Sequence, residues 1–474
     1  MKVFLTHGYF LEEDEKEKLI MKPYPPLGLL YISAWLEKHG VACEVFDSTF
    51  SSFAALCAKL EAERPELIGI YVNLMTKLNV LRLISYIRSH NLLKDSCVVL
   101  GGPEVRNHVS NFLDHGGDVI VLGEGEESML EVTQAVAVHP DGWHAELEKI
   151  PGIAFRSRVN STIENPPRPL LKSMDELPFP GRKKINLEAY FSAWKERHGQ
   201  SAVSVSTMRG CPYTCRWCSR AVYGQTYRRR SAGLVAEELR WLQENYAFDT
   251  IWFVDDVFTI SHKWMQQFHD ELSSRKLSVR YECITRADRL DEETVKLLAD
   301  TGCFRVWIGA ESGSQRVLDA MDRRVDAQQV RDMIRLARRY DMQAGTFIML
   351  GYPGETEEDI EETIRHLVES DPDLYTITVA YPIKGTPLYS EVEASLTRLP
   401  WDGSTDRDLD FRRTYPRKYY DFALRRLHNE VAFHKASGKS GFGKYKFRLK
   451  SVAAKTGMTL IRVFDNGMNF QKKA

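Results

Sequence analysis

The chain of 474 residues lacks any uncharged apolar run near the ~18 residues that a membrane-spanning helix needs. A signal peptide is not expected, because neither a long apolar segment nor a small-residue cleavage site follows Met1. Low-complexity segments and repeats of the solenoid type are missing as well. We therefore expect a folded, cytoplasmic protein without a membrane span.

The chain also has almost no net charge, since 64 Lys and Arg residues balance 65 Asp and Glu residues to give −1. No whole-protein field attracts a polyanion, so nucleic acid is not expected as a partner. A hydrophobic content of 43% and a charged content of 27% are those of an ordinary globular protein. The length predicts two or three compact units.

Cysteine is scarce, with eight in the chain, and a reducing compartment disfavours disulfides. Three cysteines lie together and suit metal ligation. The other five are scattered and are interpreted as buried core thiols. These are Cys43, Cys57, Cys97, Cys283 and Cys303.

Residues 1–140 alternate short apolar strands with amphipathic helices, which predicts an α/β fold with a doubly wound, Rossmann-like domain. Strands are expected near residues 3–6, 43–46, 67–72, 98–101 and 119–122. Two of them end in glycine-rich turns, at the carboxyl edge where open α/β sheets bind ligands. Residues 141–200 are rich in proline and read as a connector with one hairpin.

Six strand–helix units follow over residues 201–395 and predict a partial (βα)6 barrel. Their strands are expected near residues 203–207, 250–254, 280–285, 304–309, 344–350 and 375–381. Residues 396–474 form a C-terminal extension, a helical tail with one expected helix over Tyr419–Lys435. Its basic and aromatic residues 412–420 either cap the barrel and contact substrate or pack on the outside of the barrel.

The three neighbouring cysteines follow directly on the first barrel strand, in the segment Cys211-Pro-Tyr-Thr-Cys215-Arg-Trp-Cys218. Three thiolates on one tight loop can ligate three irons of a cubane and leave the fourth iron open for an exogenous ligand. The alternative is a structural zinc site. Zinc would need four ligands, and no second pair of Cys or His stands nearby in the sequence.

The spacing C-x3-C-x2-C, with an aromatic residue just before the last cysteine, resembles the signature of the radical S-adenosylmethionine (SAM) superfamily. The resemblance implies that Cys211, Cys215 and Cys218 are catalytic residues that hold a [4Fe–4S] cluster. In that family the open iron binds SAM, and the reduced cluster cleaves it to a 5′-deoxyadenosyl radical. An external one-electron reductant of the flavodoxin or ferredoxin class is then the implied partner.

Further matches to the family fall at the ends of later strands, where a barrel places its chemistry. The implied contacts with SAM are Tyr213, Trp217, Asp255, Asp256, Arg286, Glu311, Ser312 and Gly351. By this resemblance the aspartates meet the amino group of SAM, Arg286 meets its carboxylate or one of these acids, and Glu311 meets the ribose or methionine end. The alternatives are structural ion pairs at the barrel rim and ordinary tight turns.

Three segments of the first domain look like the cobalamin-binding domain that precedes the barrel in the largest radical SAM subgroup. The implied contacts are Pro26, Leu27, Gly28, Gly101, Gly102, Pro103, Glu104, Gly123, Glu124 and Gly125. Glycine turns let a flat macrocycle lie on the backbone while its nucleotide tail enters the crevice, although a generic nucleotide site would look similar.

The sequence departs from many cobalamin proteins in one respect, because the D-x-H-x-x-G motif that supplies a histidine to cobalt is absent. Glu104 follows Gly-Gly-Pro where many relatives have histidine. The lower face of a bound cobalamin is therefore expected to lack a histidine ligand. The alternative is that the domain has lost its cofactor.

Together these resemblances imply a cobalamin-dependent methyltransferase that acts on an unactivated carbon or a phosphinate phosphorus. Two SAM molecules would be consumed per turnover, one as methyl donor and one as radical source. An alternative with the same cofactors is cyclisation, oxidation or rearrangement of a tetrapyrrole, lipid or natural-product scaffold. A second alternative, an electron carrier or iron sensor, does not explain the SAM-site motifs, because a carrier needs no open iron.

Overall fold

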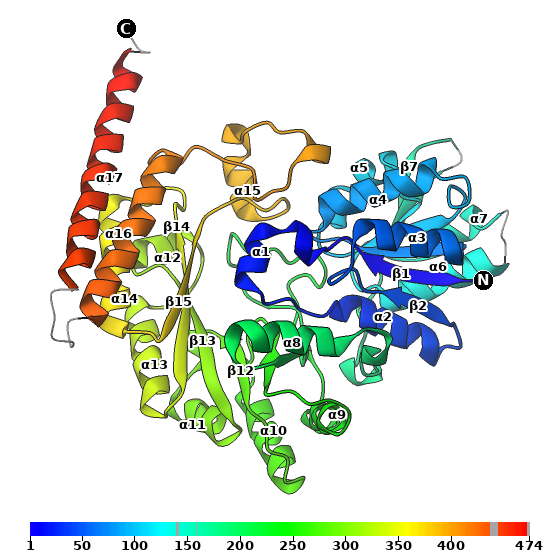
Figure 1. Ribbon diagram of the computed structural model, residues 1–474, viewed down its shortest axis with the longest axis horizontal. Coiled ribbons are helices and arrows are strands. Elements are labelled where there is room, and N and C mark those ends of the chain that lie inside the picture. The colour runs from blue at the N-terminus through cyan, green and yellow to red at the C-terminus, as the bar shows by residue number, and fades with distance from the viewer. Residues whose placement is uncertain (139–141, 158, 437–443, 472–474) are drawn as a thin grey trace. The chain divides into compact units, whose positions relative to one another are not determined.

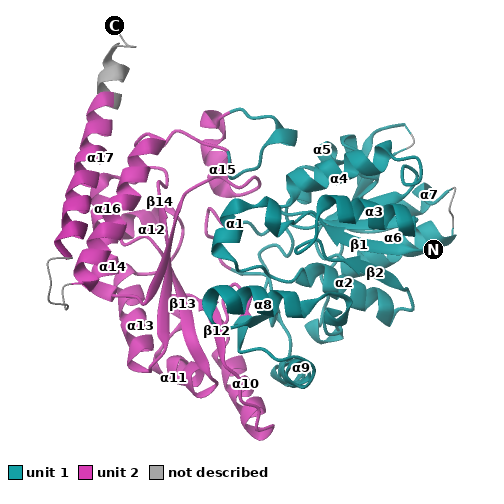
Figure 2. Ribbon diagram, in the orientation of Figure 1, with its two compact units in different colours: residues 1–212, 219–252, 398–408 teal, residues 213–218, 253–397, 409–474 magenta. Residues whose placement is uncertain are grey.

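The computed structural model describes residues 1–138, 142–157, 159–436 and 444–471, with side chains as far as residue 464. Figure 1 shows the order of its helices and strands along the chain. By their internal contacts the residues form two compact units (Figure 2). Unit 1 comprises residues 1–212, 219–252 and 398–408, and unit 2 comprises residues 213–218, 253–397 and 409–474.

Unit 1 contains a seven-stranded sheet with the strand order β2-β1-β3-β4-β5-β6-β7. Strands β1 to β5 pair in parallel, while β6 and β7 are antiparallel additions at one edge. The strands are β1 (Val3–His7), β2 (Cys43–Phe46), β3 (Leu67–Tyr71), β4 (Cys97–Gly101), β5 (Val119–Val121), β6 (Ile153–Arg156) and β7 (Thr162–Glu164).

Helices cover both faces of this sheet because successive side chains of each strand point to opposite faces. Phe4 packs in a core with α3 and α4, whereas Leu5 packs in a second core with α2 and α6. The helices of this part are α1 (Glu15–Ile20), α2 (Leu27–Lys38), α3 (Phe53–Glu63), α4 (Lys77–Ser89), α5 (Val109–Asp114), α6 (Glu126–Val138) and α7 (His144–Leu147). The doubly wound domain is confirmed, and the hairpin expected in the connector is β6–β7.

The rest of unit 1 carries the start of the second sheet. Its elements are α8 (Leu187–His198), β8 (Ala202–Val205), β9 (Met208–Arg209), β10 (Arg228–Arg229), α9 (Ala232–Asn245) and β11 (Thr250–Phe253). The second sheet has six strands, and its order β8-β11-β12-β13-β14-β15 follows the chain. The six predicted barrel strands are thus all present, each with boundaries within two residues of those expected.

Unit 2 contains the later strands of that sheet, of which β12–β13, β13–β14 and β14–β15 pair in parallel. The strands are β12 (Tyr281–Thr285), β13 (Cys303–Glu311), β14 (Gln343–Leu350) and β15 (Leu374–Val379). The helices are α10 (His262–Ser274), α11 (Glu292–Asp300), α12 (Gln315–Ala320), α13 (Ala327–Arg339), α14 (Glu357–Ser370), α15 (Pro387–Val392), α16 (Arg417–Lys435) and α17 (Tyr445–Gln471).

The C-terminal extension differs from the expectation of a single helix. The expected helix is α16, and a second, longer helix, α17, packs along it. Residues of the 412–420 segment pack on unit 2: Arg413 donates to the carbonyl of Ala380 beyond β15, and Tyr419 donates to Glu357 at the start of α14. A contact of this segment with substrate stays a prediction. No helix within the described ranges is long and apolar enough to cross a membrane.

Candidate functional site

The cysteine loop follows β9 and carries three thiols that differ in exposure. Cys215 is buried, Cys211 is partly buried and Cys218 is exposed. Among the residues that the structure describes, no three His, Cys, Asp or Glu side chains are gathered into a group able to hold a metal ion. The spacing of the thiols along the chain, rather than a preformed set of ligands, therefore supports the assignment to a cluster.

Cys215 is held in unit 2 by two guanidinium groups. Arg286 and Arg323 each donate from Nη1 to the Sγ of Cys215 over 3.8 Å. A sulfur that ligates iron carries negative charge, and two cationic N–H donors compensate that charge. The donor chemistry at this position therefore fits a cluster ligand.

Two aromatic residues of the loop anchor it on unit 2. Tyr213 stacks its ring under Arg286, 3.7 Å from the guanidinium carbon, and its hydroxyl accepts a hydrogen bond from Arg289. Trp217 packs against a buried apolar group that includes Tyr352 and Leu388. Both residues thus hold the loop in place, and the contacts with SAM that the sequence suggests for them stay predictions.

Arg286 follows directly on β12 and is buried. Its Nε donates to Asp288 over 2.7 Å, and its Nη2 donates to the carbonyl of Arg323 over 2.8 Å. The sequence left open a pairing with Asp255 or Asp256, but the carboxylate that binds Arg286 is Asp288. This partner lies two residues away, in the short 3-10 helix that follows β12.

Glu311 lies at an irregularity where β13 shifts register against β14, and its backbone is left-handed with φ of 68°. Its Oε1 faces the Nε of Arg323 over 3.9 Å. Burial raises the pKa of Glu311, while Arg323 and Arg286 act in the opposite direction. A strained backbone holding a charged side chain in a cationic recess is typical of functional sites.

Arg323 is the residue that the sequence analysis missed. Besides binding Cys215 and facing Glu311, it donates from Nη2 to the carbonyl of Gly309 over 2.9 Å. Its buried Nε has no hydrogen-bond acceptor among the described residues. This orphaned donor fits a ligand carboxylate such as that of SAM, because a buried guanidinium seeks an acceptor for each N–H.

Three further predicted residues have different surroundings. Ser312 is buried and shares a hydrogen bond of 3.2 Å with Thr363 of α14, a structural contact. Asp255 is buried behind β11, whereas Asp256 reaches the surface. Desolvation and then the charge of Asp255 raise the pKa of Asp256, so the pair would gain from a cationic ligand such as the amino group of SAM.

Gly351 begins the loop after β14 with φ of 79°, a conformation that favours glycine. Its N–H donates to the Oε2 of the fully buried Glu355 over 2.5 Å. The other carboxyl oxygen of Glu355 has no partner within the described chain. Burial raises the pKa of Glu355 to about 8. This carboxyl, also missed from sequence, therefore carries a proton at neutral pH.

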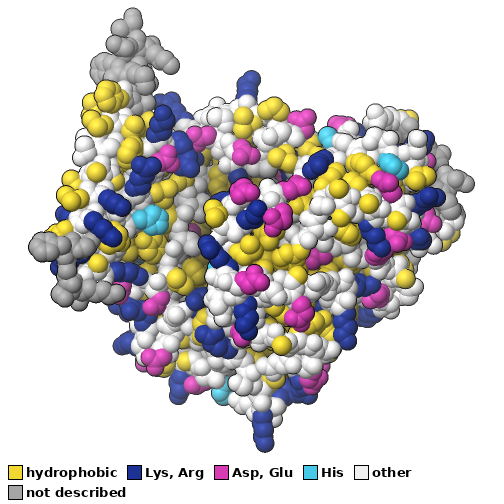
Figure 3. Space-filling model, in the orientation of Figure 1, with side chains coloured by type: hydrophobic (Ala, Val, Ile, Leu, Met, Phe, Trp, Pro, Cys, Tyr) yellow, Lys and Arg dark blue, Asp and Glu magenta, His cyan; other side chains and the backbone are white. Residues whose placement is uncertain are grey.

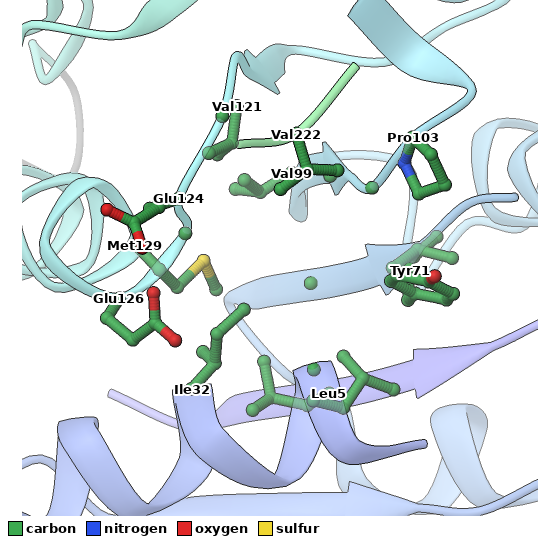
Figure 4. A pocket seen from close by; sticks show the side chains of 18 of the residues that line it. Leu5, Ile32, Tyr71, Val99, Pro103, Val121, Glu124, Glu126, Met129 and Val222 are labelled. Atoms are coloured by element: carbon green, nitrogen blue, oxygen red, sulfur yellow. The ribbon is translucent and has the colours of Figure 1, made fainter. Parts of the chain in front are cut away.

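A cavity of about 240 Å³ opens in unit 1 at the carboxyl edge of the first sheet. Apolar side chains including Leu5, Ile32 and Val99 project into it from β1, α2 and β4 (Figure 4). Seven of the predicted residues line it, and they are Gly28, Gly101, Gly102, Pro103, Gly123, Glu124 and Gly125. A narrow apolar crevice of this kind suits an aromatic base, the part of a nucleotide tail expected there.

Glycine is required at one point of this cavity. Gly102 has φ of 118°, and a Cβ added there would lie 2.3 Å from the carbonyl oxygen of Val72. At Gly101 the nearest atom to an added Cβ is 3.7 Å away, on Val121. The backbone therefore forms one wall of the cavity, which fits a ligand that lies directly on the main chain.

Glu124 also lines the cavity, but its carboxylate is engaged in buried ion pairs. It binds Arg209 and Arg228 at 2.8 Å each, and Arg209 also pairs with Glu126. Burial alone would raise the pKa of Glu124, but Arg228 and Arg209 hold it below the usual value. A contact with cobalamin from this side chain stays a prediction, and any such contact has to leave these pairs in place.

The other predicted cobalamin contacts lie elsewhere. Pro26 and Leu27 line a neighbouring cavity of about 380 Å³, next to Lys22 and Tyr24. Glu104 is buried, with its carboxylate 3.7 Å from the Nε2 of His108, and it does not line the glycine-walled cavity.

Comparisons with known proteins bear on both parts of the chain. Residues 205–367 match the family model of the radical SAM superfamily, and residues 20–133 match that of the B12-binding domain. An uncharacterized methyltransferase of Pyrococcus horikoshii is 30% identical over 407 residues, which are 84% of this chain and 85% of that protein. An anaerobic magnesium-protoporphyrin IX monomethyl ester cyclase of Cereibacter sphaeroides is 26% identical, over 78% of this chain and 60% of that protein.

Among solved structures, the radical SAM methyltransferase TsrM from Kitasatospora setae, with cobalamin and a [4Fe–4S] cluster bound, superposes with a TM-score of 0.68 at 20% identity. The match covers 83% of this chain and 74% of TsrM, and it establishes a common fold. The fold and the cysteine loop together define the class of protein. It is an iron–sulfur enzyme that also carries a doubly wound domain of the kind that binds nucleotides. The chain belongs to the radical SAM superfamily and carries a B12-binding domain, so its cofactors are a [4Fe–4S] cluster, SAM and cobalamin.

Proposed function

We propose that this enzyme transfers a methyl group from SAM to an unactivated carbon or phosphinate phosphorus of a small-molecule, lipid or tetrapyrrole substrate. The observation that supports it best is that one chain contains both the three-thiol loop and the glycine-walled cavity. Relatives whose names describe methyl transfer favour this outcome over ring closure. The cyclase relative keeps cyclisation as the second candidate.

The residues have separate tasks in this proposal. When bound, the cluster supplies the electron that cleaves SAM, and cobalamin carries the methyl group. Cys211, Cys215 and Cys218 hold the cluster. Arg323 orients Cys215, and its free Nε donates to the SAM carboxylate, while Asp256 meets the SAM amino group.

The domain roles follow the sequence boundaries. We assign cobalamin binding to residues 1–140, a connector to 141–200, SAM cleavage to 201–395 and an accessory role to 396–474. The enzyme itself supplies no electrons for SAM cleavage, so the proposal includes a one-electron donor of the flavodoxin or ferredoxin class as partner.

The test uses protein purified without oxygen, reconstituted with iron, sulfide and cobalamin, and incubated with SAM and dithionite. Methyl transfer predicts both S-adenosylhomocysteine and 5′-deoxyadenosine among the products. 5′-Deoxyadenosine alone, with cobalamin present, would favour cyclisation or oxidation. Cys215→Ala should lose the cluster signal in electron paramagnetic resonance and both products, whereas Cys43→Ala, outside the loop, should keep them.

A further inference from the structure

The C-terminal hairpin, defined as α16 and α17, is the most basic part of the chain. Residues 417–464 contain twelve Lys or Arg and only two Asp or Glu, in a chain whose formal net charge is −1. The helix α17 has no acidic residue from position 445 to position 464. A local excess of one charge this large marks a surface for a partner of opposite charge.

The face of α17 toward unit 2 uses some of these cations in ion pairs. Lys455 pairs with Glu357 and binds Glu361 at 2.8 Å, and Arg448 binds Glu430 at 2.7 Å. Gly457 allows the two helices of the hairpin to approach closely, since a Cβ there would lie 2.5 Å from the ring of Phe422. This face of α17 is therefore fixed against the rest of unit 2.

The opposite face of α17 presents an apolar stripe to solvent. Its members fall on one side of the helix, because they are three, four or eight residues apart, with Phe464 directly after Val463. They are Tyr445 (52% exposed), Leu449 (71%), Val452 (51%), Leu460 (51%), Val463 (59%) and Phe464 (67%). Figure 3 shows hydrophobic side chains along α17 with Lys and Arg side chains beside them. We call this set the α17 stripe.

Lysines border the α17 stripe on the same helix. Lys446 and Lys450 are exposed, and Lys446 lies over the ring of Phe447, 5.0 Å from its centre. An apolar stripe bordered by cations is the pattern of a helix that lies in the plane of a membrane surface, with its apolar side chains among the acyl chains and its lysines at anionic headgroups.

We propose that α17 docks this enzyme on an anionic phospholipid bilayer, lying on its surface through the α17 stripe. Nucleic acid fits less well, because phosphates would use the lysines but leave six large apolar side chains in water. A second copy of α17 also fits less well, because Lys446 and Lys450 would meet a facing stretch, residues 445–464, that contains cations and no acid.

The test is co-sedimentation of the full-length protein with vesicles of phosphatidylglycerol and phosphatidylcholine, compared with phosphatidylcholine alone. We expect binding to the anionic vesicles that weakens as salt rises, and little binding to the neutral ones. The triple variant Leu449→Ser, Leu460→Ser and Val463→Ser should bind at least tenfold more weakly. Its matched control, Leu19→Ser, Leu92→Ser and Val159→Ser, changes equally exposed apolar residues elsewhere and should bind like the wild type.

A charge variant tests the lysines separately. Lys446→Glu with Lys450→Glu should weaken binding by more than tenfold, since each lysine at an anionic surface contributes about a fivefold factor. Lys94→Glu with Lys172→Glu is its control. Equal binding of the triple variant and the wild type, or no binding of the wild type to anionic vesicles, would overturn the proposal. So would a dimer in sedimentation equilibrium that the triple variant abolishes, or tighter binding to an RNA oligonucleotide than to vesicles.

Discussion

Arg323 donates from Nη1 to the Sγ of Cys215 over 3.8 Å, although 107 residues separate the two positions. The same guanidinium binds the carbonyl of Gly309 and faces Glu311. One buried cation therefore connects a cluster ligand with the irregular end of β13, where the family resemblance places SAM.

This relationship predicts the effect of Arg323→Gln on the cluster. A cation donating to a ligand sulfur stabilises the more negative, reduced cluster, so its loss should lower the midpoint potential, by on the order of tens of millivolts. Redox titration followed by electron paramagnetic resonance measures it. Arg323→Lys keeps the charge and should recover part of the shift. An unchanged potential in Arg323→Gln, or an equal shift in the exposed Arg324→Gln, would contradict the assignment.

Glu355 predicts a pH dependence of stability. Its pKa is about 8 in the folded protein against 4.5 as the usual value, so the folded state keeps a proton that the unfolded state releases between these limits. The contribution of this group to the free energy of unfolding is therefore fully present below pH 4.5. It is lost as pH rises from there through 8, and the total loss is roughly 3–5 kcal/mol.

Glu355→Gln mimics the protonated carboxyl and keeps an oxygen for the N–H of Gly351. Its melting temperature should match that of the wild type near pH 5 and exceed it increasingly toward pH 8.5, as followed by circular dichroism. Glu358→Gln, an exposed change three residues further on at the start of α14, should show no such trend. Parallel melting curves for wild type and Glu355→Gln across this range would show that the carboxyl is ionised when folded.

Arg209→Met tests the buried ion pairs of unit 1. Removing one partner leaves Glu126 without its cation in a dry environment, which costs about 3–5 kcal/mol. The urea midpoint should fall accordingly, and adding Glu126→Gln should recover part of the loss. Arg106→Met, at an exposed position, should leave the midpoint within error. If Arg209→Met lowers the urea midpoint no more than Arg106→Met does, water reaches the Arg209–Glu126 pair.

Gly101→Val tests the glycine-walled cavity. Its φ is not left-handed and the nearest atom to a new Cβ is 3.7 Å away, so the side chain fits the fold but occupies the cavity. Binding of hydroxocobalamin, measured by absorbance after gel filtration, should fall at least tenfold. Gly403→Val, where nothing lies within 4 Å, is the control. Undiminished binding by Gly101→Val would place the cofactor elsewhere.

The sequence predicted the strands well because parallel strands covered on both faces are continuous apolar runs, as in Leu67–Tyr71. It did not predict α17, although the helix has 27 residues. Gly457 lies near its middle and reads as a helix breaker, whereas the structure needs glycine there because Phe422 packs against the backbone.

The site residues likewise divide into those that the sequence predicted and those that only the fold reveals. The cysteine spacing is local, so the three thiols were evident from the sequence alone. Arg323 and Glu355 act through partners brought near by folding, and no nearby residue signals their roles. The Gly-Glu-Gly turn suggested a cofactor contact for Glu124, but one of its ion-pair partners, Arg209, lies 85 residues away and only the fold reveals it.

The buried ion pairs of unit 1 also determine whether its N-terminal part could fold as a separate fragment. A fragment ended at residue 200 would retain Glu124, Glu126 and Arg182 but lose Arg209, Arg228 and Glu238, the groups that neutralise them. Such a fragment would have charges in its interior without their ion-pair partners. A stable fragment of this domain therefore has to include the stretch from Arg209 to Glu238, so the folding unit extends past the boundary that the sequence places near residue 200.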